Sequence, residues 1–197
     1  MSPTASPPRF YFDYVDPGSF LIERHLTALD DEVPVGVDRV PFELCPPPKD
    51  LIDPATAPWR SRWQQAGTEV ESAGISLAMP RFVPWTRKAH EFALLAREQQ
   101  RFDSVHRALF EAFHLEGRDL GRVDVLLQIA VHHGMDLTRT KVVLDADRFA
   151  HAVEQTRAEA ERLGIPGVPA LLAGHRWLVG LQDSDTLLAF LRDQTQG

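Results

Sequence analysis

The chain has 197 residues, of which 44% are hydrophobic and 25% are charged, and its formal net charge is −7. These values are typical of a globular protein, and no apolar run approaches the roughly 20 residues that a membrane helix needs. The acidic balance argues against a nucleic-acid partner, because phosphate binding relies on clustered Lys and Arg. Cys45 is the single cysteine, which excludes dithiol–disulfide exchange within one protomer and a zinc site built from several cysteines.

The N-terminal residues 1–8 are rich in Ser and Pro and have neither the basic start nor the apolar stretch of a signal peptide. We therefore predict a disordered tail over 1–8 and a cytoplasmic protein. Aromatic and β-branched residues dominate 9–15 and predict a first strand.

Asp16-Pro17 then predicts the start of a helix. The carboxylate can accept hydrogen bonds from free amides of the first turn, and Pro supplies the φ of the first helical position. We expect this helix to run to about Leu29 and a second strand to cover 33–44, with Cys45 at the strand's end as a buried, unreactive thiol. A helix between two strands predicts a βαβ unit with parallel strands.

Between 58 and 163 the apolar residues recur with helical spacing. Glycines 74, 117 and 134 are expected helix stops. Two of the apolar stripes are Trp59, Trp63, Ala66 and Val70, and Ala89, Phe92, Ala93 and Ala96.

The strand pattern returns after Gly164. Residues 170–173 and 176–179 flank Gly174-His175 as a predicted hairpin, and Asp183 or Ser184 is expected to open a last helix. The order β-α-β, helical block, β-β-α predicts an α/β protein with a thioredoxin-like fold. Residues 9–57 and 164–197 would form the thioredoxin-like domain, and 58–163 a large all-helical insertion.

Three segments carry a resemblance to a known family. They are FDYVDPGSFL at 12–21, HRALFEAFHLEGRD at 106–119 and GIPGVPAL at 164–171. In this order and spacing they resemble the DsbA-like thioredoxin-fold family, in its branch of FrnE-like oxidoreductases, 2-hydroxychromene-2-carboxylate isomerases and kappa-class glutathione transferases. The resemblance extends over most of the chain, from Phe10 to Leu191.

The family's active-site turn is C-P-x-C in redox members and begins with Ser in the isomerases and transferases. Here it reads Asp16-Pro17-Gly18-Ser19, so both cysteine positions are lost. The resemblance makes Asp16 and Ser19 the candidate catalytic residues and Pro17 and Gly18 ligand contacts. Asp16 can equally be only a helix N-cap, and Ser19 a surface hydroxyl. Since a helix N-terminus favours a carboxylate, we expect the pKa of Asp16 to lie below about 3.9, which would make it a weak general base.

The resemblance also implies a cis Val168-Pro169 bond that faces the Asp16 turn. The backbone of Val168 would then pair with an extended ligand, or Pro169 would only shape the fold. Gln182 belongs to a turn that holds glutathione in the transferases. This chain has Gly180-Leu181-Gln182 without the family's Arg, which argues against glutathione, and no cofactor is required.

Other candidate residues predict no metal site. His132 and His133 are neighbours that face different directions on a helix, and His106 and His114 lack an accompanying metal-binding signature. Residues 82–85, with Trp85, are candidates for the border of a cleft under the helical insertion.

Whether the protein is an enzyme stays open at this stage. One hypothesis is a divergent oxidoreductase or isomerase that binds a small thiol or aromatic ligand between the Asp16 turn and the cis-Pro169 loop. The alternative is a non-catalytic peptide-binding or chaperone-like module. A homodimer is compatible with both hypotheses.

Overall fold

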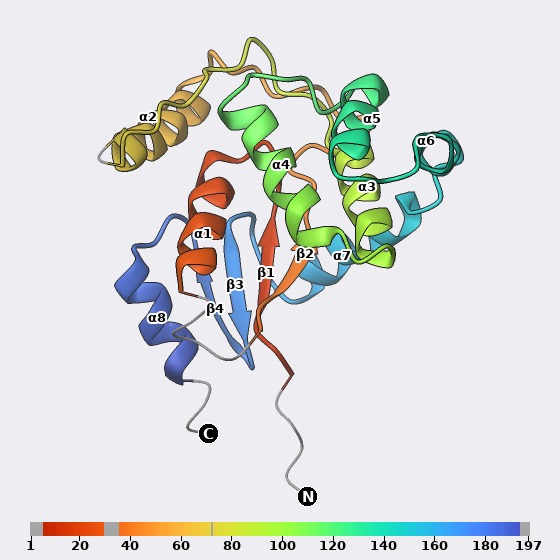
Figure 1. Cartoon of the computed structure of the whole chain (residues 1–197). Coiled ribbons are helices and arrows are strands. Elements are labelled where there is room, and N and C mark those ends of the chain that lie inside the picture. Colours follow the sequence, from red (N-terminus) through yellow and green to blue (C-terminus); the bar gives the residue numbers. More distant parts are fainter. Residues whose placement is uncertain (1–5, 30–35, 72, 194–197) are drawn as a thin grey trace, which may run out of the picture.

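The structure is a computed structural model that describes residues 6–29, 36–71 and 73–193. Its centre is a four-stranded sheet in the order β2-β1-β3-β4 (Figure 1). The strands are β1 (Arg9–Phe12), β2 (Asp38–Pro41), β3 (Ala170–Ala173) and β4 (Arg176–Val179). β1 and β2 are parallel, whereas β3 is antiparallel to β1 and to β4. The predicted parallel βαβ unit and the C-terminal hairpin are confirmed.

Both N-terminal strands are shorter than predicted. β1 ends at Phe12 because the chain turns at Asp13, whose carbonyl accepts a hydrogen bond from the Asp16 amide at 3.1 Å. β2 ends at Pro41 and not at residue 44, because the Leu44 amide donates to the Asp13 carboxylate at 2.7 Å instead of to a strand. The expected start of the second strand at Val33 lies outside the described residues.

Helices α2 to α7 lie between β2 and β3 in the chain, as the helical spacing predicted. Gly74, Gly117 and Gly134 have φ values of 72°, 66° and 69°, the left-handed conformation that ends helices. The division into a domain of 9–57 and 164–197 and an insertion of 58–163 remains a prediction. The helices are α1 (Pro17–Ala28), α2 (Ala57–Glu71), α3 (Arg87–Glu98), α4 (Phe102–His114), α5 (Val123–His132), α6 (Leu137–Asp145), α7 (Ala150–Arg162) and α8 (Ser184–Arg192).

The alternation of β1 separates two hydrophobic clusters on the two faces of the sheet. Phe10 and Phe12 pack in the larger cluster, with buried residues of α1, α2, α3, α4 and α8. Tyr11 points to the other face and packs with Ala160 of α7. Within the described chain, no helix combines the length and apolar character needed to cross a membrane.

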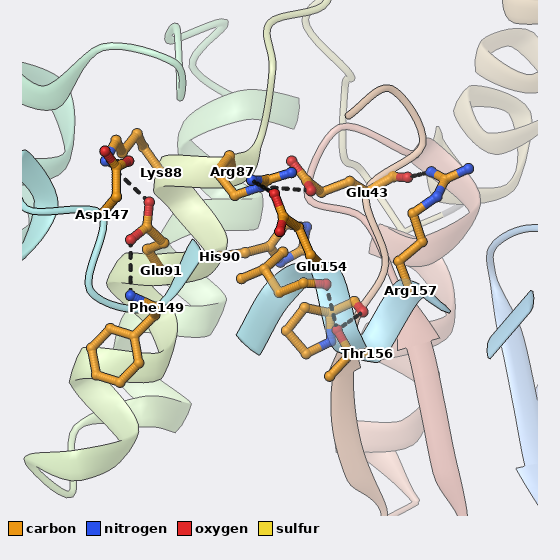
Figure 2. A network of polar contacts seen from close by, with 12 residues as sticks. Glu43, Arg87, Lys88, His90, Glu91, Asp147, Phe149, Glu154, Thr156 and Arg157 are labelled. Carbon is orange, nitrogen blue, oxygen red and sulfur yellow. Dashed lines mark hydrogen bonds and ion pairs between the residues drawn. The ribbon is translucent and has the colours of Figure 1, made fainter. Parts of the chain in front are cut away.

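A polar clamp joins α3 and α7 to the segment that follows β2 (Figure 2). The Arg87 guanidinium donates to the Glu43 carboxylate at 2.7 Å and to the Glu154 carboxylate at 2.6 Å. Arg157 donates to the carbonyl of Glu43, and the Thr156 hydroxyl donates to the carbonyl of Pro41 at 2.8 Å. These contacts fix the segment after β2. The Leu44 amide of this segment binds the carboxylate of Asp13, which lies at the start of the turn between β1 and α1.

Candidate functional site

The candidate site is built on the turn from β1 into α1. Asp16 is the N-cap of α1 and Pro17 its first residue, as the Asp-Pro pair predicted. Oδ2 of Asp16 accepts hydrogen bonds from the Ser19 amide at 2.6 Å and from the Ser19 hydroxyl at 2.8 Å. The same hydroxyl accepts from the Asp13 amide at 3.3 Å. Both the proton and a lone pair of the Ser19 hydroxyl are therefore engaged inside the turn.

The surroundings of Asp16 overturn one sequence-based prediction. Asp16 is only 1% exposed, and burial raises the pKa of its carboxyl from 3.8 to about 6, against the opposing hydrogen bonds of Ser19 and the charge of Arg62. The predicted pKa below 3.9 was wrong because desolvation outweighs the amides and the dipole of the helix. A carboxyl with a pKa near 6 is suited to general acid–base chemistry around neutral pH.

The Val168-Pro169 peptide bond is cis, as predicted. Pro169 lies against the Asp16 turn so closely that a Cβ atom added at Gly18 would be 3.0 Å from its Cδ atom and 3.2 Å from Oδ2 of Asp16. A larger residue at position 18 would force Pro169 or Asp16 to shift, so glycine permits this close approach. A cavity of about 290 Å³ lies between the turn and the Pro169 loop.

This Asp16 cavity is lined by four of the predicted site residues, Asp16, Gly18, Val168 and Pro169. Helix α2 adds Arg62 and Gln65, which the sequence analysis missed. Nη1 of Arg62 lies 3.4 Å from Oδ1 of Asp16. The signal available in the sequence was weak: Arg62 precedes Trp63 of the buried stripe and so belongs to a polar face of α2.

Two predicted ligand contacts do not border the Asp16 cavity. Pro17 is buried at the start of α1. The Gln182 side chain donates to the Val179 carbonyl at 3.2 Å, and the Gln182 carbonyl contacts Nδ1 of His25 at the same distance. The structure therefore does not bring the Gln182 side chain to Asp16.

Comparison with known proteins fits this geometry. The model of the DSBA-like thioredoxin domain matches residues 9–192. The chain belongs to this family. It is 26% identical over 191 residues to the uncharacterized protein YwbO of Bacillus subtilis, covering 94% of this chain and 96% of YwbO.

Among solved structures, three relatives of this DSBA-like chain share its fold. The probable DsbA oxidoreductase SCO1869 of Streptomyces coelicolor has a TM-score of 0.81 at 21% identity, covering 95% of this chain and 89% of that one. A 2-hydroxychromene-2-carboxylate isomerase has a TM-score of 0.78 at 15% identity, covering 96% and 94%. The cytosolic disulfide reductase DsbM of Pseudomonas aeruginosa, solved with GSH, has a TM-score of 0.68 at 17% identity, covering 96% and 99%.

The one thiol of this DSBA-like protein lies outside the site. Cys45 is buried, as predicted, but in the loop after β2 and not at the strand's end. Its Sγ–H donates to the Asp50 carbonyl at 2.7 Å, and burial raises the pKa of the thiol. Trp85 packs on the same loop, where its indole N–H donates to the Lys49 carbonyl at 3.0 Å, and does not border the Asp16 cavity.

His106 and His114 meet at Tyr14, directly behind the Asp16 turn. Nε2 of His114 donates to the Tyr14 carbonyl at 3.0 Å, and burial lowers the pKa of His114 to about 3. Nδ1 of His106 lies 2.8 Å from the Tyr14 hydroxyl. The described residues hold no group of three or more His, Cys, Asp or Glu side chains that could bind a metal ion.

A buried cluster of titratable residues on the other side of the turn was not predicted. Nε2 of His90 lies 3.3 Å from Oδ1 of Asp13, and all three side chains of Asp13, His90 and Glu43 are fully buried. Burial raises the pKa of Glu43. Residues from the turn after β1, from α3 and from the segment after β2 meet here, so sequence spacing held no signal for the cluster.

Proposed function

We propose that this protein binds a small thiol or aromatic ligand in the Asp16 cavity and catalyses a proton transfer on it, with the Asp16 carboxyl as general acid and base. One observation carries the proposal: a buried carboxyl with a pKa of about 6 borders a cavity formed against a cis-proline loop. Near neutral pH both protonation states of such a group are populated. An isomerase-type reaction uses this chemistry and needs no pair of thiols.

Two further groups would position the ligand. The Arg62 guanidinium could bind a ligand carboxylate, and it supplies a positive charge that the Gly180-Leu181-Gln182 turn lacks. Among the described residues, no backbone hydrogen bond involves the peptide groups of Val168, so they are free to pair with an extended thiol peptide of the glutathione type. The structure of DsbM with GSH supports this ligand class, and its name as a cytosolic reductase agrees with a cytoplasmic location.

Turnover of 2-hydroxychromene-2-carboxylate, with and without millimolar glutathione, tests the proposal. We expect kcat/KM to rise with pH through about 6 as Asp16 ionises, and to fall on the order of a hundredfold in Asp16→Asn. Arg62→Gln should mainly raise KM, whereas Arg81→Gln, which changes an exposed arginine outside the cavity, should leave both constants unchanged. Equal activity of Asp16→Asn and the wild type would contradict the proposal.

A second candidate is a peptide-binding module without catalysis, which the exposed edge of the sheet favours. Trp177 and Val179 on β4 are 46% and 36% exposed, and Val179 borders the Asp16 cavity. An extended peptide could pair with this edge and with Val168. Binding of unfolded peptides that is equal in wild type and Asp16→Asn, without turnover of any small ligand, would favour this candidate.

A further inference from the structure

A larger cavity, of about 550 Å³, lies between α1 and α4 beside β2. None of its lining residues borders the Asp16 cavity, and its volume falls within the range of about 300–1,000 Å³ that is typical of small-molecule sites. Phe20 of α1 and Phe110 of α4 contribute to its walls, with their ring centroids 6.1 Å apart. These rings offer an apolar surface for the body of a ligand.

A buried imidazole lies at the floor of this α1–α4 cavity. His106 is 2% exposed, and its Nε2 atom has no hydrogen-bond partner among the described residues, although Oε2 of Glu23 is 3.4 Å away. Burial lowers the pKa of His106 and raises that of Tyr14, which favours the neutral form of both groups. The nearby Glu23 carboxylate favours the proton on Nε2, and the Tyr14 hydroxyl then donates to Nδ1.

Glu23 supplies an acceptor next to this donor. Its two carboxylate oxygens each accept a hydrogen bond of 3.1 Å from Arg39. Burial alone would raise the pKa of Glu23, but the charge and the two hydrogen bonds of Arg39 lower it, so Glu23 is a carboxylate. An N–H donor and a carboxylate acceptor thus lie side by side at the floor, which is the complement of a hydroxyl group, since a hydroxyl accepts and donates at once.

The rim of the cavity carries two charges of each sign. Arg24 and Arg107 supply the cations, and Asp103 and Glu111 the anions. Within residues 6–29, 36–71 and 73–193, none of these four side chains forms an ion pair. A ligand with one positive and one negative group would find a partner for each at this rim.

We propose that the α1–α4 cavity binds an amino acid with a phenolic side chain. The aromatic ring would pack against Phe20 and Phe110, and the hydroxyl would bond to His106 and Glu23. The ammonium and carboxylate groups would face the charged rim. This proposal does not depend on the chemistry of Asp16.

Calorimetric titration of the full chain with L-tyrosine and three analogues tests the proposal. Phenylalanine lacks the hydroxyl, tyramine the carboxylate and 3-(4-hydroxyphenyl)propanoate the ammonium group. We expect L-tyrosine to bind, and each analogue to bind about tenfold more weakly, the usual effect of losing one hydrogen-bonded or ion-paired group in a buried site. Absence of tyrosine binding, or equal binding of phenylalanine, would overturn the proposal.

Substitutions at the rim and at the floor of the α1–α4 cavity test whether tyrosine binds there. Arg24→Gln and Glu111→Gln at the rim should each weaken tyrosine binding several-fold, and His106→Phe at the floor should remove the preference for tyrosine over phenylalanine. The controls are Arg81→Gln and Glu71→Gln, which make the same chemical changes at exposed positions away from the cavity and should bind as the wild type does. Because the rim residues other than Glu111 are exposed and Glu111 is half-buried, the rim variants should fold even if His106→Phe does not. Rim variants with unchanged affinity would refute the assignment.

Discussion

Replacing Asp16 with Asn should stabilise the fold above pH 6, although it removes a charge next to Arg62. Each pKa unit corresponds to about 1.4 kcal/mol, so a rise from 3.8 to about 6 means that ionising the buried carboxyl costs about 3 kcal/mol. Because the folded-state pKa is raised, the stabilising effect of the protonated form is complete below about pH 3.8 and is lost as the pH rises through 6.

Asparagine at position 16 can still act as the N-cap of α1, and it has no buried charge whose ionisation costs free energy. Asn is as good an N-cap as Asp, and its carbonyl can accept both Ser19 hydrogen bonds. Arg62 is 53% exposed, and its weak attraction is already contained in the net cost of about 3 kcal/mol. We therefore expect Asp16→Asn to gain about 3 kcal/mol at pH 8, or about 6–12 °C in Tm, and almost nothing at pH 4.

Denaturant unfolding of both proteins at several pH values between 4 and 8 measures this difference. Asp183→Asn is the matched control, because Asp183 caps α8 but is exposed, and hydrogen bonds from Thr186 lower its pKa. This control should lose a little stability at pH 8, the opposite sign. A loss of stability in Asp16→Asn at pH 8, or a gain that does not change with pH, would refute burial as the cause of the raised pKa.

Three further predictions concern packing, acid stability and the thiol. Gly18→Ala should lower the free energy of unfolding, measured with denaturant, by about 1–3 kcal/mol because the added Cβ meets Pro169. The control Gly67→Ala, in open space on α2, should raise it by about 0.5–1 kcal/mol. Equal effects of the two substitutions would contradict the close approach of Gly18 and Pro169. Because the pKa of His114 is lowered in the folded state, its contribution to stability is present above pH 6.5 and is lost as the pH falls toward 3. In His114→Gln the free energy of unfolding should therefore fall by about 4–5 kcal/mol less over this pH range than in the wild type. An equal fall in both proteins would exclude His114 as the cause. Cys45 should react with a disulfide reagent at least about tenfold more slowly in the native than in the unfolded protein, and equal rates would show that it is accessible.

The fold was largely predictable because its signals are local. The Asp16-Pro17 pair, the helical stripes and the Gly174-His175 turn each depend on a few neighbouring residues. The ends of the first two strands were not predictable from propensity. The first ends where the Asp13 carbonyl accepts from the Asp16 amide, and the second where the Asp13 carboxylate binds the Leu44 amide across 31 positions of the chain.

The candidate site was predictable in position but not in electrostatics. The resemblance placed Asp16 opposite Pro169, and the structure confirms that they meet. The direction of the Asp16 pKa shift depends on which helices cover the turn. Arg62 comes from α2, and no sequence pattern links it to Asp16. The sequence therefore indicated the helix N-terminus, which lowers the pKa of Asp16, but not the burial, which raises this pKa by more.

The clamp at Glu43 also bears on how the chain unfolds. Arg87 of α3 and Arg157 of α7 are far apart in the helical segment, and both bind Glu43 next to the sheet. The main hydrophobic cluster likewise joins Phe12 of β1 to Phe92 and Phe110 of the helices. Because the helices and the sheet share one interior, we expect them to melt in a single cooperative transition, and the segment 58–163 made on its own should expose these aromatic side chains and aggregate.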